Sequence, residues 1–97
     1  MQLSDNIKQH IVQILLPYAP ETIGVFGSYS RDEQKNGSDL DILIRLKGRI
    51  SLLKLVMLEQ QISEAIGIPV DLVTEQGIRN ERLRAYIHKD LIIIYSS

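Results

Sequence analysis

The chain has 97 residues, a length at which one hydrophobic core can form a folded domain without a disulfide or a structural metal. Hydrophobic residues make up 44% and charged residues 24%, which excludes a disordered chain, and the absence of cysteine excludes a disulfide framework and a thiolate metal site. The formal net charge of -1 argues against an extended nucleic-acid footprint, and no signal peptide or membrane-length apolar run is present, so we expect a single cytoplasmic domain over residues 1–97.

The first predicted element is an amphipathic helix over residues 4–16. Apolar residues recur there at helical spacing, Ser4 is a suitable N-cap, and Pro17 stops the pattern. A short run rich in β-branched residues, 22–26, then predicts a strand. The glycine and serine that follow this run predict a tight turn, and the polar residues up to 37 predict a loop.

Residues 39–46 are predicted to form the second strand, because polar and apolar residues alternate at the start of the segment. Asp39, Asp41 and Leu43 share one face of this strand. The other face is predicted to belong to the core and consists of Leu40, Ile42 and Ile44.

The longest predicted helix covers residues 52–66. Ser51 precedes it as a suitable N-cap, and Gly67 and Pro69 stop it. Its apolar stripe is predicted to face the core, with partner binding as a secondary use. The residues of this stripe are Leu52, Leu55, Leu58, Ile62 and Ile66.

Three more elements complete the prediction. Residues 70–73 form a third strand, 79–88 a charged helix, and 91–95 a fourth, β-branched strand. The residues of the charged helix predicted to point inward are Leu83, Tyr86 and Ile87. Four strands and three helices in this order predict an α+β fold, in which helices pack against a small mixed sheet.

Asp39 and Asp41 are the first candidate site residues. Their Cα atoms lie roughly 6.5 to 7 Å apart on one face of a strand, so the two carboxylates can converge on a single cation. Like charges held together resist ionisation, and a divalent ion that prefers hard oxygen ligands, such as Mg²⁺, resolves that conflict. An Asp-x-Asp pair on an edge strand is also often a solvated face, so the assignment depends on its context.

The context is the Gly27-Ser28 turn and Ser38, which precedes the acidic pair. A glycine at the end of a strand lets a backbone amide approach a phosphate, and the hydroxyl of Ser28 can donate to a phosphate oxygen. A Gly-Ser turn alone is commonplace. Next to a strand that opens with Ser38 and two carboxylates, the turn predicts phosphate donors beside a metal site.

These residues and their spacing resemble the signature of the polymerase β-like nucleotidyltransferases. The matching pattern is Gly27-Ser28-x-x-Arg31, nine residues between Ser28 and Ser38, and Ser38-Asp39-x-Asp41 before apolar residues. Within that superfamily the chain is similar to the minimal nucleotidyltransferase (MNT) family, whose length it shares. Asp32 is a departure, since many relatives carry glycine after the arginine.

The resemblance implies a nucleotidyltransferase fold with ATP lying over a mixed sheet and two Mg²⁺ ions that bridge phosphates and carboxylates. It also implies a third carboxylate on a neighbouring strand, which orients or deprotonates the acceptor hydroxyl. Asp71 is the candidate because Val70 and Leu72 face the other way, with an exposed strand acid as the alternative. The implied nucleotide-binding residues are Gly27, Ser28, Arg31 and Ser38, and the implied catalytic and metal-binding residues are Asp39, Asp41 and Asp71.

A biological role follows from the same resemblance. MNT proteins commonly act as antitoxins and transfer AMP from ATP to a tyrosine of a HEPN-type toxin. One alternative is an antitoxin that neutralises its partner by binding alone, although the intact motif argues against lost catalysis. The second alternative is a small-molecule nucleotidyltransferase, but those relatives carry an added acceptor domain for which 97 residues leave no room.

Overall fold

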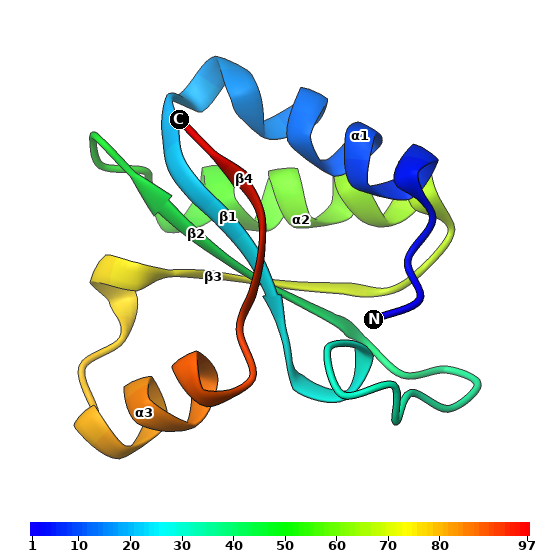
Figure 1. Cartoon of the computed structure of the whole chain (residues 1–97). Coiled ribbons are helices and arrows are strands. Elements are labelled where there is room, and N and C mark those ends of the chain that lie inside the picture. The colour runs from blue at the N-terminus through cyan, green and yellow to red at the C-terminus, as the bar shows by residue number, and fades with distance from the viewer.

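The computed structural model describes residues 1–97 as a four-stranded mixed sheet with helices on both faces (Figure 1). The helices are α1 (Asp5–Leu15), α2 (Leu52–Ile66) and α3 (Glu81–Lys89). The strands are β1 (Pro20–Phe26), β2 (Leu40–Leu46), β3 (Val70–Thr74) and β4 (Ile92–Ser96). Short 3₁₀ turns follow α1, β1 and β3. The predicted α+β class and the predicted order of elements are confirmed, and none of the three helices has the length and apolarity needed to cross a membrane.

The strands lie in the order β3-β2-β1-β4. β1 pairs antiparallel with both β2 and β4, whereas β2 and β3 are parallel and are joined through α2. A parallel connection of this kind needs a crossover, which the helix supplies. The register places Asp41 of β2 beside Phe26 at the end of β1 and beside Asp71 of β3. Three segments far apart in the sequence therefore meet at one end of the sheet.

Capping side chains set the helix starts. The hydroxyls of Ser4 and Ser51 each accept a hydrogen bond from the backbone N–H three residues on, at 3.2 and 3.1 Å. α2 ends at Gly67 in the left-handed conformation (φ 72°), as its sequence predicts. The third helix starts later than predicted, because Asn80 is its N-cap. The Oδ1 atom of Asn80 accepts hydrogen bonds from the backbone amides of Arg82 and Leu83.

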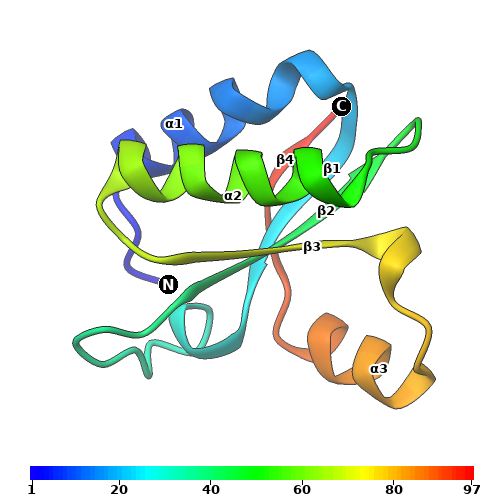
Figure 2. The ribbon, with the colours of Figure 1, turned by 180° about the vertical axis from the view of Figure 1, so that it is seen from behind.

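α1 and α2 cover one face of the sheet and α3 packs on the other (Figures 1 and 2). The largest fully buried side chains of the first layer are Ile11, Leu15, Ile23, Leu40, Ile42, Ile44, Leu58 and Ile62. The second, smaller cluster consists of Phe26, Leu43, Ile78 and Ile87. Asp41 and Leu43 share a face by strand alternation, so the carboxylate lies on the side of the sheet that only the short α3 covers.

Three residues predicted to face inward are exposed: Leu83 and Tyr86 of α3, and Leu52 of α2. The predictions for them were wrong. Helical periodicity identifies an apolar stripe but not how far the sheet extends beneath it. α3 has nine residues and buries only Ile87, while α2 buries Leu58 and Ile62 near its centre.

The outer edge of β3 is covered by side chains of α2. The backbone N–H of Leu72 donates to the Glu59 carboxylate at 2.8 Å, and that of Val70 donates to the Ser63 hydroxyl at 3.0 Å. Unpaired amides on an edge strand invite pairing with another chain, and buried ones are costly to leave unsatisfied. α2 therefore ends the sheet at β3.

This edge gives a stability prediction. Glu59→Ala leaves the Leu72 amide without its acceptor, and we expect the free energy of unfolding to fall by about 1–3 kcal/mol. Urea denaturation measures the difference. The control is Glu64→Ala on the same helix, an exposed glutamate, which should change stability by less than about 0.5 kcal/mol. Equal losses in the two variants would contradict the role given to Glu59.

Candidate active site

The turn after β1 depends on Gly27. This residue is buried and has a φ of 74°, a conformation that L side chains rarely adopt. A Cβ built at this position would collide with Oδ2 of Asp41. The Ser30 hydroxyl donates to the Gly27 carbonyl at 2.8 Å, and the Glu33 amide donates to the Ser28 carbonyl at 2.8 Å. The predicted tight turn is confirmed, and it lies directly against the acidic strand.

Asp41 lies at the centre of the acidic group. Its register partner in β3 is Asp71, and Asp39 comes two residues before it. Burial raises the pKa of Asp41 from its usual 3.8 to about 6, and the negative charges of Asp71 and Asp39 add to the rise. The charges of Asp39 and Asp71 thus act on the Asp41 carboxyl, as expected for side chains that share a site.

A metal site is not preformed. No group of three or more acidic or histidine side chains is arranged to hold a cation. Carboxylates repel one another, and a divalent cation held between them offsets that repulsion. The three side chains supply only oxygen ligands, which Mg²⁺ prefers. A cation would also relieve the repulsion that helps to raise the pKa of Asp41. The metal-binding roles of Asp39, Asp41 and Asp71 fit these residues and stay a prediction.

Arg31 is held by two carboxylates. Its Nε donates to Glu33 at 2.6 Å and its Nη1 donates to Asp90, next to α3, at 2.9 Å. These bonds, with Glu33 the stronger cause, raise the pKa of Arg31 above its already high value. The positive charge of Arg31 also lowers the pKa of Asp41 against the effect of burial. The guanidinium therefore acts on the site electrostatically while it is anchored to the far end of the chain.

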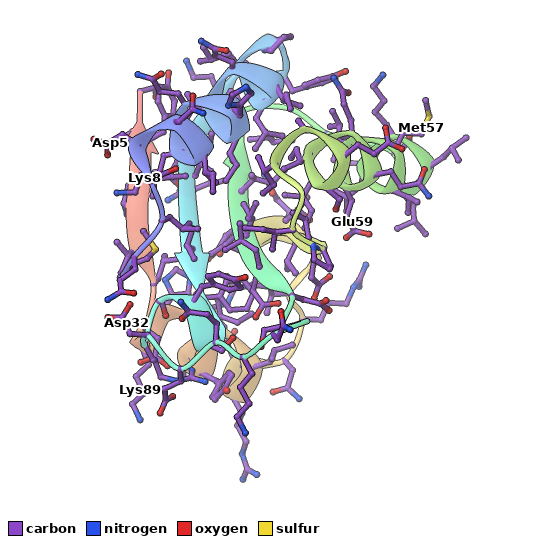
Figure 3. All side chains as sticks on the ribbon, turned by 90° about the vertical axis from the view of Figure 1, so that its right-hand side faces the viewer. Asp5, Lys8, Asp32, Met57, Glu59 and Lys89 are labelled. Atoms are coloured by element: carbon purple, nitrogen blue, oxygen red, sulfur yellow. The ribbon has the colours of Figure 1, made fainter.

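Asp32 takes a backbone conformation that glycine adopts more readily. Its φ is 57°, in the left-handed region that aspartate tolerates better than most residues. Its carboxylate lies 3.3 Å from the N-terminal ammonium, and Figure 3 shows it on the loop below the strands. The position after Arg31 therefore has a left-handed backbone although it is not glycine.

Ser38 closes the same loop. Its Oγ accepts a hydrogen bond from the Lys35 amide at 2.8 Å, which leaves the hydroxyl proton free to donate. Binding of nucleotide by Ser38 stays a prediction, as it does for Gly27, Ser28 and Arg31.

Sequence reasoning missed two groups at this loop. Asp90 lies 59 residues from Arg31, and no local pattern predicts that the two meet. The Gln34 side chain carries a buried oxygen without a hydrogen-bond partner. The one sequence feature that could have pointed to Gln34 is its position between Ser28 and Ser38 of the motif.

Comparisons with known proteins identify the family of the chain. Residues 5–94 match the family model described as nucleotidyltransferase domain. A Methanocaldococcus jannaschii protein assigned by name as a protein adenylyltransferase is 42% identical over 93 residues, which cover 96% of this chain and 95% of that protein. The protein adenylyltransferase MntA of Thermococcus cleftensis is 34% identical over 79 residues, covering 81% and 80% of the two chains.

Solved structures share the fold. A minimal nucleotidyltransferase superposes with a TM-score of 0.73 at 28% identity, over 88% of this chain and 86% of that chain. A toxin-antitoxin structure with AMP-PNP superposes with a TM-score of 0.84 at 23% identity, over 93% and 73% of the chains. At the lower identity, the likeness shows the fold alone.

Proposed function

The chain belongs to the nucleotidyltransferase domain family and is a nucleotidyltransferase, and from this premise we propose that it transfers AMP from ATP to a tyrosine hydroxyl of a HEPN-type toxin, as its antitoxin. The observation that carries the proposal is the register of β1, β2 and β3, which brings the Gly27 turn, Asp41 and Asp71 together. The names of the relatives, protein adenylyltransferases, support a protein acceptor.

Each residue has a role in the proposed reaction. Asp39 and Asp41, with Asp71, would hold Mg²⁺, which when bound neutralises phosphate charge and stabilises the attacking and leaving oxygens. The amides of the Gly27 turn and the Ser28 hydroxyl hold the terminal phosphates. The acceptor oxygen attacks the α-phosphorus, the bond to the β-phosphate oxygen breaks, and pyrophosphate leaves. Positioning and charge stabilisation supply most of the rate.

We assign Asp71 as the general base of the proposed reaction because it is exposed on the edge strand, where an external hydroxyl can reach it. A tyrosine suits such a base. Its unperturbed pKa of about 10 lets a carboxylate take its proton more readily than that of an aliphatic hydroxyl.

The test uses labelled ATP, Mg²⁺ and the product of the gene adjacent to this one. We expect that protein to gain whole AMP units on a tyrosine, with pyrophosphate released, and to gain none when the enzyme carries Asp41→Asn. Tight binding that inhibits the partner, with no mass change under any nucleotide, would contradict the proposed transfer and favour an antitoxin that acts by binding alone. AMP on a small molecule and none on protein would favour the second alternative.

The role of Asp71 can be measured separately. Asp71→Asn should slow the single-turnover step about 10²- to 10⁴-fold, the range for loss of a general base, while the Kd for ATP changes much less. Asp5→Asn, an exposed acid at the start of α1, serves as the control and should change neither quantity. Parallel losses in rate and in ATP affinity would mean that Asp71 acts mainly as a metal ligand and not as the general base.

The pKa of Asp41 predicts a pH dependence for cation binding. A carboxyl must lose its proton to bind Mg²⁺, so below the pKa of about 6 the affinity should fall, by up to about tenfold per pH unit. We also expect ATP and Mg²⁺ to strengthen each other's binding, since they share ligands. Calorimetry at pH 5, 6 and 7.5 measures both effects. Affinities that do not change between pH 5 and 7.5 would remove Asp41 from the cation site.

A further inference from the structure

Four apolar side chains lie exposed together on the N-terminal half of α2, and we call them the α2 patch. They are Leu52, Leu53, Val56 and Met57, which are 76%, 72%, 42% and 53% exposed. Their spacing of one and four residues puts them on one side of the helix. Figure 3 shows Met57 pointing away from the sheet. Single exposed apolar residues are ordinary, but a contiguous group on a small domain marks an interaction surface.

Two cations, Arg49 and Lys54, flank the α2 patch. Residues 42–58 include no Asp or Glu, although the whole chain has a formal net charge of -1. Of the four cations in this stretch, Arg49 and Lys54 flank the patch, whereas Arg45 and Lys47 lie near Glu21 and Glu75 and do not border it. None of the four cations forms an ion pair within the chain, and the Lys54 ammonium lies 5.4 Å from the centre of the Tyr18 ring. The first turn of α2 also lacks an acidic residue, so its positive end is not neutralised.

These charges discriminate between occupants. A two-fold pairing of α2 with a second copy would bring Arg49 and Lys54 of one chain close to those of the other, and like charges in an interface oppose association. A membrane surface suits a basic amphipathic helix, but the rest of the exposed α2 surface is polar or acidic, with Gln60, Gln61 and Glu64. An apolar surface with an acidic border complements the patch best.

We propose that the α2 patch docks an amphipathic, acidic helix of the protein whose hydroxyl is adenylylated, a proposal that rests on the function proposed above. The apolar side of that helix covers Leu53 and Met57, and its carboxylates meet Arg49 and Lys54. Protein interfaces commonly have such an apolar centre within a polar rim.

The location of the α2 patch fits this role. α2 lies along the edge strand β3, to which Glu59 and Ser63 bind, and β3 carries the exposed Asp71. Glu59 and Ser63 bond to β3 on either side of Asp71 and follow the α2 patch in the helix, so a partner helix that runs along α2 beyond the patch reaches the edge of the sheet at Asp71. Asp71 faces away from α2, because Val70 and Leu72 on either side of it are buried in the α1 and α2 layer. Docking and chemistry thus use different residues, and substitutions in the patch should leave ATP binding intact.

The experiment measures binding of the adjacent-gene product by calorimetry without nucleotide. We expect Leu53→Glu and Met57→Glu to weaken binding about 100-fold, the loss typical of a hot-spot residue. The matched control is Leu83→Glu on α3, whose leucine is 48% exposed, and it should stay within about threefold of the wild type. Arg49→Glu should weaken binding about tenfold and reduce its salt dependence, whereas Arg82→Glu, the same charge change on α3, should do neither.

Four results overturn the proposal: no binding by the wild type, equal binding by all variants, a wild-type dimer that Leu53→Glu dissociates, or binding to phosphatidylserine vesicles that Leu53→Glu abolishes. The dimer identifies a second copy as the occupant, and vesicle binding identifies a membrane. Failure of the proposed function is seen separately, as a partner that binds through the α2 patch and gains no AMP.

Discussion

Asp41→Asn should abolish AMP transfer and make the metal-free protein more stable at neutral pH. Asp41→Asn removes the central carboxylate of the proposed Mg²⁺ site and with it the proposed charge compensation of the reacting phosphate, so we expect turnover to fall by at least about 10³-fold. The same carboxylate is strained by burial and by its neighbours when no cation is bound, which is why its pKa is raised to about 6.

The sign of the stability effect follows from proton binding. Between pH 3.8 and 6 the unfolded chain releases the Asp41 proton before the folded chain does, so the wild type loses stability as the pH rises through this window. Linkage sets the loss at no more than about 3 kcal/mol, and solvent screening at a half-buried position reduces it to about 1–2 kcal/mol. The asparagine variant lacks this loss. It should exceed the wild type by that amount at pH 7 and by little at pH 4.

Urea denaturation in EDTA at pH 4, 5, 6 and 7 tests the stability effect, and turnover with Mg²⁺ and ATP tests the catalytic one. Asp5→Asn should follow the wild type in both measurements. A variant that unfolds, or one that retains wild-type turnover, would assign Asp41 to the structure and not to the site.

Gly27→Ala should reduce turnover at least about 100-fold and destabilise the fold by about 1–3 kcal/mol. The left-handed backbone conformation costs an alanine about 1–2 kcal/mol. The new Cβ also collides with Oδ2 of Asp41, so the carboxylate must move, and a displacement of about 1 Å at a reacting site can cost about 10² in rate.

Gly67→Ala separates the two effects. Gly67 has nearly the same φ, 72°, but nothing lies within 4 Å of a Cβ built there. It should therefore lose stability through backbone strain and keep its catalytic rate per folded molecule. If both alanine variants keep wild-type rates, the contact between the turn and Asp41 has no catalytic importance.

Local chemistry in the sequence determined much of this protein. Ser51 and Gly67 delimit α2 at the predicted residues, because capping depends on backbone groups within a few positions. Strand alternation predicted that Asp39 and Asp41 share one face, although β2 begins one residue after Asp39 in the structure. The spacing from Gly27 to Asp41 identified the family that the comparisons confirm.

Tertiary structure alone decided which distant residues meet. The pairing of Asp41 with Asp71 depends on the register of a parallel crossover, and the Arg31–Asp90 bond spans 59 residues, so neither leaves a periodic signal. The exposure of Leu52 and Leu83 could not be predicted from the sequence either. Helical periodicity shows which side of a helix is apolar. How much of that side is buried depends on how far the sheet extends beneath the helix, because burial is set by the neighbours that folding brings together.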